Sequence, residues 1–108
     1  MSQLTKSATF YLVHALDAPE KEALRAQVSP DHRQYMETLR HQLLIGGPLL
    51  DDAGVKRIGS AFVIQADSRE QVEALVKQEP YNMAGVFESV TIRLFQSVMF
   101  EPTLLQGV

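Results

Sequence analysis

The sequence predicts an α+β fold with its elements in the order β-α-β-β-α-β. Residues 7–16 are rich in aromatic and β-branched side chains, residues 48–66 form two extended segments around a polar turn, and two stretches of helical patterning separate the strands. This order is typical of a ferredoxin-like split βαβ sandwich, in which two helices cover one face of an antiparallel sheet.

The length and composition fit one compact domain. The chain has 108 residues, 45% of them hydrophobic and 21% charged, which is ordinary for a globular protein. We expect a single domain over residues 1–108, with a core at about 8–98 and a C-terminal tail at 99–108.

The first strand, residues 7–16, is apolar on both faces. Phe10 and Leu12 fall on one face, whereas Tyr11 and Val13 fall on the other. Such a strand is predicted to be buried on both sides.

The main helix is predicted to begin at Ser29-Pro30, a capping residue followed by a proline that suits the first helical turn. It should run through residues 31–45 and stop at the Gly-Gly-Pro of residues 46–48. The preceding segment, 17–28, is predicted to be a short helix or an ordered loop.

A hairpin, a second helix and a last strand follow. The hairpin has a short strand, a turn at 51–54 and a longer strand at about 56–66. Asp67 or Ser68 is predicted to cap a helix over 68–78, with Gln71 in the capping-box position. Proline 80 should end this helix, and residues 86–98 should form the last strand.

Two helices leave the other face of the sheet open. In the last strand, Val90 and Ile92 point one way, whereas Thr91 and Arg93 point the other. Phe95 and Tyr11 are also expected to point away from the helices. A second copy packed sheet to sheet would cover this face, so we expect a homodimer.

Charge and residue usage exclude several classes of partner. The net charge is −3, and no basic stripe of the kind that binds nucleic acid is present. The chain has no cysteine and no apolar segment of the roughly 20 residues that cross a membrane. We expect a cytoplasmic protein without nucleic-acid or membrane partners.

His32 is the first candidate for chemistry. At about 100° per residue it shares the buried stripe of the main helix with Met36 and Leu39, whereas His41 lies opposite in solvent. Near a helix N-terminus, the dipole and desolvation favour the neutral imidazole, which can accept a proton. The alternative is a hydrogen-bonded core histidine.

Glu79 is the second candidate. It falls on the same side of the second helix as Val72 and Val76, and Pro80 follows it. A carboxylate there could orient an imidazole or move a proton itself. The alternative is a solvated charge at a helix end.

Other polar residues give weaker signals. His14, His32 and His41 do not have the spacing of a metal site, so we expect none. Ser60 is not part of a nucleophile motif, and a structural role is favoured. Arg93 could bind an anionic ligand or pair across a dimer interface.

Three segments resemble the YCII-related family: SPDHRQYMETLRHQLLIGGPLLDD, RIGSAFVIQADSREQVEALVKQEPY and AGVFESVTIRLF. The shared motifs are a histidine at the start of a helix, Gly-Pro, Gly-Ser, acid-Pro-Tyr and Ala-Gly-Val-aromatic-Glu, over residues 10–95. This resemblance implies a dimeric α+β barrel with His32 at the family's histidine. Glu79 stands where the family usually has aspartate, and His14 stands where relatives often have an aromatic residue.

The resemblance implies an enzyme, since some members resemble lyases or dehydrochlorinases that act on small aromatic compounds. We therefore expect a cofactor-independent enzyme that uses His32 as general base or acid and Glu79 as auxiliary carboxylate. His14, Ser60, Tyr81 and Arg93 are expected to contact the small-molecule ligand. The alternative is a non-catalytic ligand-binding or interaction module with the same dimeric fold.

The predicted layout leaves the two candidates apart. The start of the first helix and the end of the second lie at opposite ends of the sheet, on the order of 15 Å apart. A dimer could bring His32 and Glu79 together, a bent helix with segment 80–85 could close the gap, or the two residues could serve separate ends of a cleft.

Overall fold

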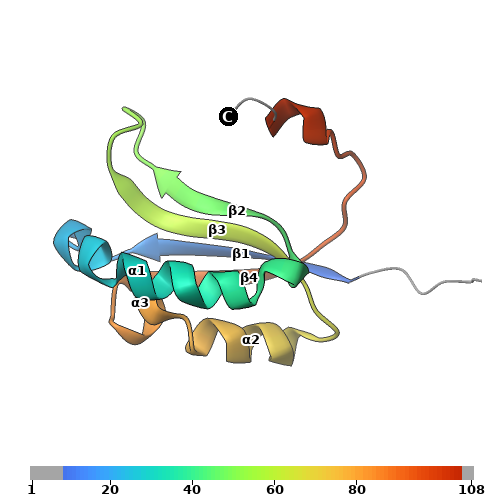
Figure 1. The fold of residues 1–108 in the computed structure, drawn as a ribbon, viewed down its shortest axis with the longest axis horizontal. Helices are drawn as coiled ribbons and strands as arrows, with labels where there is room; N and C mark the ends of the chain where they lie inside the picture. Colours follow the sequence, from blue (N-terminus) through green and yellow to red (C-terminus); the bar gives the residue numbers. More distant parts are fainter. Residues whose placement is uncertain (1–8, 106–108) are drawn as a thin grey trace, which may run out of the picture.

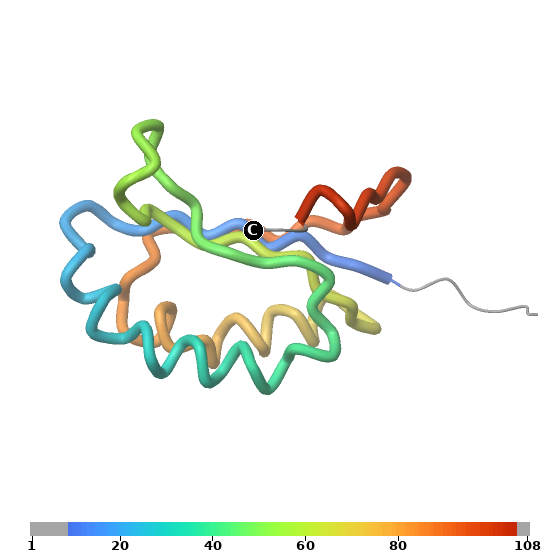
Figure 2. Tube along the Cα trace, turned by 45° about the horizontal axis from the view of Figure 1, so that its top comes forward, coloured from blue at the N-terminus to red at the C-terminus, as the bar shows by residue number. Residues whose placement is uncertain are grey.

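The computed structural model describes residues 9–105 and shows a four-stranded sheet in the order β2-β3-β1-β4, with every neighbouring pair antiparallel. The helices α1, α2 and α3 cover one face of this sheet (Figures 1 and 2). The elements are β1 (Phe10–Asp17), α1 (Glu22–Thr38), the 3-10 helix η1 (Arg40–Gln42), β2 (Leu43–Leu50), β3 (Arg57–Gln65), α2 (Arg69–Lys77), α3 (Pro80–Met83), β4 (Phe87–Phe95) and the 3-10 helix η2 (Pro102–Leu105). The predicted ferredoxin-like α+β class is confirmed.

The core lies between the sheet and the helices. Strand β1 supplies its centre through Tyr11 and Val13, which pack with Val72 and Val76 of α2. The expectation that Tyr11 points away from the helices is wrong, because it shares the strand face of Val13. Within residues 9–105, no helix is long and apolar enough to span a bilayer.

Helix α1 begins at Glu22, earlier than predicted, and Pro30 lies inside it. A proline in a helix removes the hydrogen bond to the carbonyl four residues earlier, here that of Ala26. Both Ala26 and Pro30 are exposed, so water can satisfy the freed carbonyl. The predicted start at Ser29 was wrong because this solvent-side proline is tolerated.

The end of the helix also differs from the prediction. α1 stops at Thr38, and the residues predicted to end it, 46–48, lie inside β2. Gly46 pairs with Phe62 and Pro48 with Ser60. A short apolar run is compatible with either a helix or a strand, and residues 43–50 form a strand because they pair along β3. Because β2 is an edge strand, it also tolerates a proline.

The second half of the chain follows the prediction closely. Ser68 caps α2, since its Oγ accepts the N–H of Gln71 at 3.2 Å. The Gln71 side chain accepts the N–H of Asp67 at 2.9 Å, so the two ends of the cap are tied reciprocally. The short helix α3 was not predicted; Pro80 ends one helix and begins the next.

The sheet face opposite the helices stays open in the single chain. In Figure 2 the β2–β3 turn and the segment after β4 both rise on this side of the sheet. A hollow of about 350 Å³ lies on this face, lined mainly by apolar residues of β1, β2 and β3, among them Leu12, Ile45 and Val63. Residues 7–8 of the predicted first strand and 106–108 of the predicted tail lie outside the described residues.

Candidate active site

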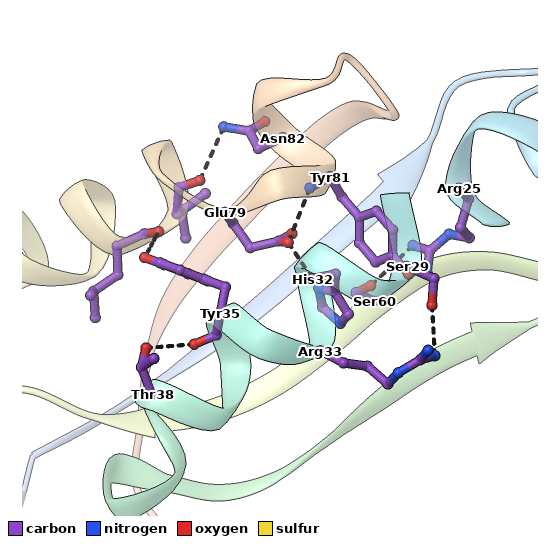
Figure 3. A network of polar contacts seen from close by, with 12 residues as sticks. Arg25, Ser29, His32, Arg33, Tyr35, Thr38, Ser60, Glu79, Tyr81 and Asn82 are labelled. Carbon is purple, nitrogen blue, oxygen red and sulfur yellow. Dashed lines mark hydrogen bonds and ion pairs between the residues drawn. The ribbon is translucent and has the colours of Figure 1, made fainter. Parts of the chain in front are cut away.

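His32 and Glu79 lie in direct contact within one chain (Figure 3). The imidazole Nδ1 of His32 is 2.8 Å from Oε1 of Glu79. The Glu79 side chain is 4% exposed and that of His32 is 20% exposed. A carboxylate can only accept, so a neutral His32 ring that bonds to it does so through Nδ1–H and keeps Nε2 as an acceptor.

The backbone fixes Glu79 at this place. The residue before a proline is pushed out of helical geometry, and Glu79 has φ −68° and ψ 126°. Its Oε1 also accepts the N–H of Tyr81 at 3.1 Å and so caps α3. Glu79 is 3% exposed, which excludes the alternative of a solvated helix-end charge.

The intrachain contact overturns the expectation that His32 and Glu79 lie at opposite ends of the sheet. Because α1 begins at Glu22, His32 lies in its second half, and the argument from the helix N-terminal dipole does not apply. Beyond α2 the chain turns at Glu79 into α3, which packs on α1. Segment 80–85 therefore closes the gap.

Tyr81 forms a wall beside His32. The two rings stack with their centroids 4.1 Å apart and their planes at 21°. On its other side, Cζ of Arg25 lies 4.2 Å from the centroid of the Tyr81 ring. Tyr81 is buried between His32 and Arg25. These contacts fix the orientation of the Tyr81 ring and of the His32 ring stacked on it.

Arg25 ties the site to the sheet. Its Nε donates to Oδ2 of Asp17 at 2.7 Å, and its Nη2 donates to Asp17 Oδ1 and to Ser60 Oγ, both at 3.0 Å. Burial by itself lowers the pKa of Arg25, but the bond and charge of Asp17, with smaller contributions from Tyr81 and Glu79, outweigh it and raise this pKa. Arg25 therefore stays charged, and Ser60 is a structural partner of it.

A cleft of about 280 Å³ opens between α1 and the β2–β3 edge of the sheet. Its lining includes His32, Tyr81, Arg25, Ser60 and Phe62. Nε2 of His32 has no hydrogen-bond partner among the described side chains and backbone. Since Nδ1 faces Glu79, Nε2 is the ring nitrogen available to a molecule in the cleft.

The other predicted ligand contacts lie elsewhere. His14 of β1 pairs with Thr91 of β4 and lies on the open face of the sheet. Arg93 pairs with Leu12 on the same face. Neither residue lines the cleft of His32, because the sheet lies between them. His41, in η1, is exposed as predicted.

Arg25 and Asp17 were not among the predicted site residues. A usable signal was present, because His32 lies seven positions after Arg25, a spacing that places both residues on one face of a helix. The wrong helix start hid this spacing. In the described part of the chain, no three His, Cys, Asp or Glu side chains are grouped to hold a metal ion.

Comparison with known proteins finds relatives of this chain in sequence. Protein YciI of Escherichia coli O6:H1 is 30% identical over 95 residues, a match that covers 82% of this chain and 97% of that protein. An uncharacterised protein of Haemophilus influenzae is 27% identical over 96 residues and is matched over 98% of its length.

A solved structure also matches. It is 5-chloro-2-hydroxyhydroquinone dehydrochlorinase (TftG) from Burkholderia phenoliruptrix AC1100, in complex with 2,5-dihydroxybenzoquinone. The TM-score is 0.75 at 26% identity, and the match covers 81% of this chain and 93% of that chain. The YCII-related domain profile matches residues 9–96, so the chain belongs to the YCII-related domain family.

Proposed function

We propose that the protein is an enzyme that carries out acid–base chemistry on a small hydroxylated ring compound, of the lyase or dehydrochlorinase type. The observation that carries this proposal is the 2.8 Å contact between Glu79 and His32 at the wall of a cleft. A buried carboxylate that accepts from Nδ1–H fixes the tautomer in which Nε2 can take a proton from a bound molecule.

The cleft suits a planar ligand. The stacked rings of His32 and Tyr81 form one wall, and Phe62 and Met36 supply apolar surface. A volume of about 280 Å³ holds a single ring with small substituents. The similarity to the dehydrochlorinase TftG, whose structure holds a dihydroxybenzoquinone, supports the same class of ligand here.

For a halogenated hydroxyarene, the proposed reaction needs only proton transfers and the departure of halide. His32 takes a proton from one hydroxyl group and returns it to the ring carbon that bears the halogen. Removal of a second hydroxyl proton then expels halide with the electron pair of the carbon–halogen bond. The net change is loss of H⁺ and halide, so the reaction consumes no oxidant or reductant.

The test is a turnover assay with 5-chloro-2-hydroxyhydroquinone, read as chloride release and as a change in ring absorbance. We expect the wild type to release chloride faster than buffer and His32→Gln to lose this acceleration. Equal rates in wild type and His32→Gln would remove His32 from catalysis. Binding of the compound without turnover in the wild type would favour the alternative of a ligand-binding module.

We also propose that two copies pair through the open face of the sheet. Leu16, Ile45 and Phe95 are 40%, 45% and 37% exposed, and a hollow of about 350 Å³ lies on this face. Exposed apolar patches of this kind mark interaction surfaces. Because both copies carry the same open face, a two-fold symmetric contact would cover the open face of each copy. Arg93 lies on this face and would then pair across the interface.

A further inference from the structure

The mouth of the cleft carries two arginines without a carboxylate partner. Arg33, on α1, and Arg57, at the start of β3, both line the cleft of His32 and an adjoining outer hollow of about 480 Å³. Neither forms a salt bridge to a carboxylate in the part of the chain that the structure describes. Both are exposed to solvent at this mouth.

Other cations beside the cleft are neutralised. Arg25 is paired with Asp17 at 2.7 Å, and Lys56 lies 3.6 Å from Glu22. No Asp or Glu is among the residues that line the inner cleft. The chain as a whole has a net charge of −3, so the positive charge at this mouth is a local feature of an acidic protein.

Arg33 is held in place by its own helix. Its Nη1 donates to Oγ of Ser29 at 2.9 Å, one turn earlier on α1, and Ser29 lines the same cleft (Figure 3). A guanidinium has five donors, so this bond leaves others free for a ligand. Two planar guanidinium groups at one opening fit an anionic oxygen group, because a carboxylate can accept two parallel N–H bonds from one guanidinium and a phenolate oxygen can accept from both groups.

We propose that the cleft selects anionic ring compounds, with a carboxylate or phenolate held by Arg33 and Arg57 and the ring placed in the cleft beside His32. The inference rests on the proposed function and adds the charge of the substrate to it. It also assigns the orientation: the anionic group lies at the mouth, and the remainder of the ring reaches Nε2 of His32.

The test compares 3,4-dihydroxybenzoate with 3,4-dihydroxybenzamide, two probes of nearly equal shape that differ by one negative charge. Calorimetry or NMR titration of the wild type should give tighter binding of the benzoate, by about fivefold or more, and added salt should reduce this preference. The double variant Arg33→Gln/Arg57→Gln should bind both probes equally. Lys77→Gln is the control, because it removes a positive charge from α2, away from the cleft.

The test of anion binding can fail or succeed independently of the test of the proposed enzymatic function. His32→Gln should keep the preference for the benzoate, even though it is expected to lose turnover. A preference that persists without any His32-dependent turnover would leave the anion site standing and reject the proposed enzyme. Equal binding of the two probes by the wild type, binding of neither at millimolar concentration, or an unchanged preference in the double variant would overturn the inference.

Discussion

A single carboxylate oxygen, Oε1 of Glu79, lies 2.8 Å from Nδ1 of His32 and 3.1 Å from the backbone N–H of Tyr81. The same atom therefore orients the candidate base and caps the helix that carries its stacking partner. The position of His32 is therefore coupled to the turn after α2, and only a substitution that keeps the acceptor oxygen but removes the charge can separate the effect on chemistry from the effect on stability.

The substitution Glu79→Gln should lower turnover while keeping the fold. The amide oxygen can still accept both hydrogen bonds, but the negative charge that stabilises a protonated His32 is lost. We expect a loss in kcat of about 10- to 100-fold and a change in the free energy of unfolding within about 1 kcal/mol. Glu79→Ala should also lose about 1–2 kcal/mol of stability, because the α3 cap is removed. A Gln variant with wild-type kcat would reject the role of the charge.

Arg25 is expected to be a stability determinant. Its side chain and that of Asp17 are 6% and 7% exposed, so Arg25→Met leaves Asp17 buried without its partner. We expect a loss of about 3–5 kcal/mol in chemical denaturation. The exposed pair Arg40–Glu37 gives the control, and Arg40→Met should cost less than about 1 kcal/mol. Similar values for the two variants would contradict the assigned importance of the buried pair.

Gly59 is required by the close approach of β1 and β3. A Cβ at this position would lie 2.3 Å from the carbonyl oxygen of Ala15, an atom of the backbone that cannot move aside. Gly59→Ala should therefore destabilise the fold by about 1–3 kcal/mol in thermal or chemical unfolding. A Cβ at Gly47 would meet nothing within 4 Å, so Gly47→Ala should change stability by less than about 0.5 kcal/mol. Equal effects would show that the β1–β3 spacing is looser than described.

Tyr35 should make stability fall at alkaline pH. Its hydroxyl donates to the carbonyl oxygen of Leu75 at 2.6 Å, and burial, followed by the charge of Glu79, raises the pKa of Tyr35 above 10.0. The folded state then holds the hydroxyl proton of Tyr35 more tightly than the unfolded chain does. The stability that Tyr35 contributes is therefore full below pH 10.0 and is lost as the pH rises through the raised pKa. The stability advantage of wild type over Tyr35→Phe should shrink above this pH, and a constant difference would contradict the shift.

The open sheet face should control assembly. Sedimentation of the wild type at micromolar concentration should show a dimer, and Ile45→Glu should shift it to monomer, because a charge would be buried at the contact. Met83→Glu, an exposed position on α3 at the helical side, should remain dimeric. A monomeric wild type would reject the pairing.

Much of the fold could be predicted because local patterns and tertiary packing agree. The cap at Ser68, the alternation in β4 and the hairpin turn all carry short-range signals that the structure keeps. The first helix could not be placed correctly. Ser29-Pro30 has the signature of a helix start, and only the exposure of Ala26 and Pro30 in the folded chain shows why the helix continues through it.

The sequence singled out His32 and Glu79 as candidates but did not predict their arrangement. His32 and Glu79 were identified from their helical faces, whereas their contact depends on where α1 begins and on the unpredicted helix α3. Arg25 was missed because its seven-residue spacing from His32 has meaning only if one helix contains both. The face of the sheet on which Tyr11 lies likewise could be assigned only from the pairing register of β1 with β3 and β4.

The central claim, that Glu79 holds His32 with Nε2 free to accept a proton, is tested most directly by the tautomer of His32. Long-range ¹H–¹⁵N NMR of protein labelled in its histidine rings reports which nitrogen carries the proton, at a pH where the ring is neutral. The His32 signals are identified by their absence from the spectrum of His32→Gln. The account predicts a protonated Nδ1 and an unprotonated Nε2 in the wild type. A proton on Nε2 with a bare Nδ1 would contradict it.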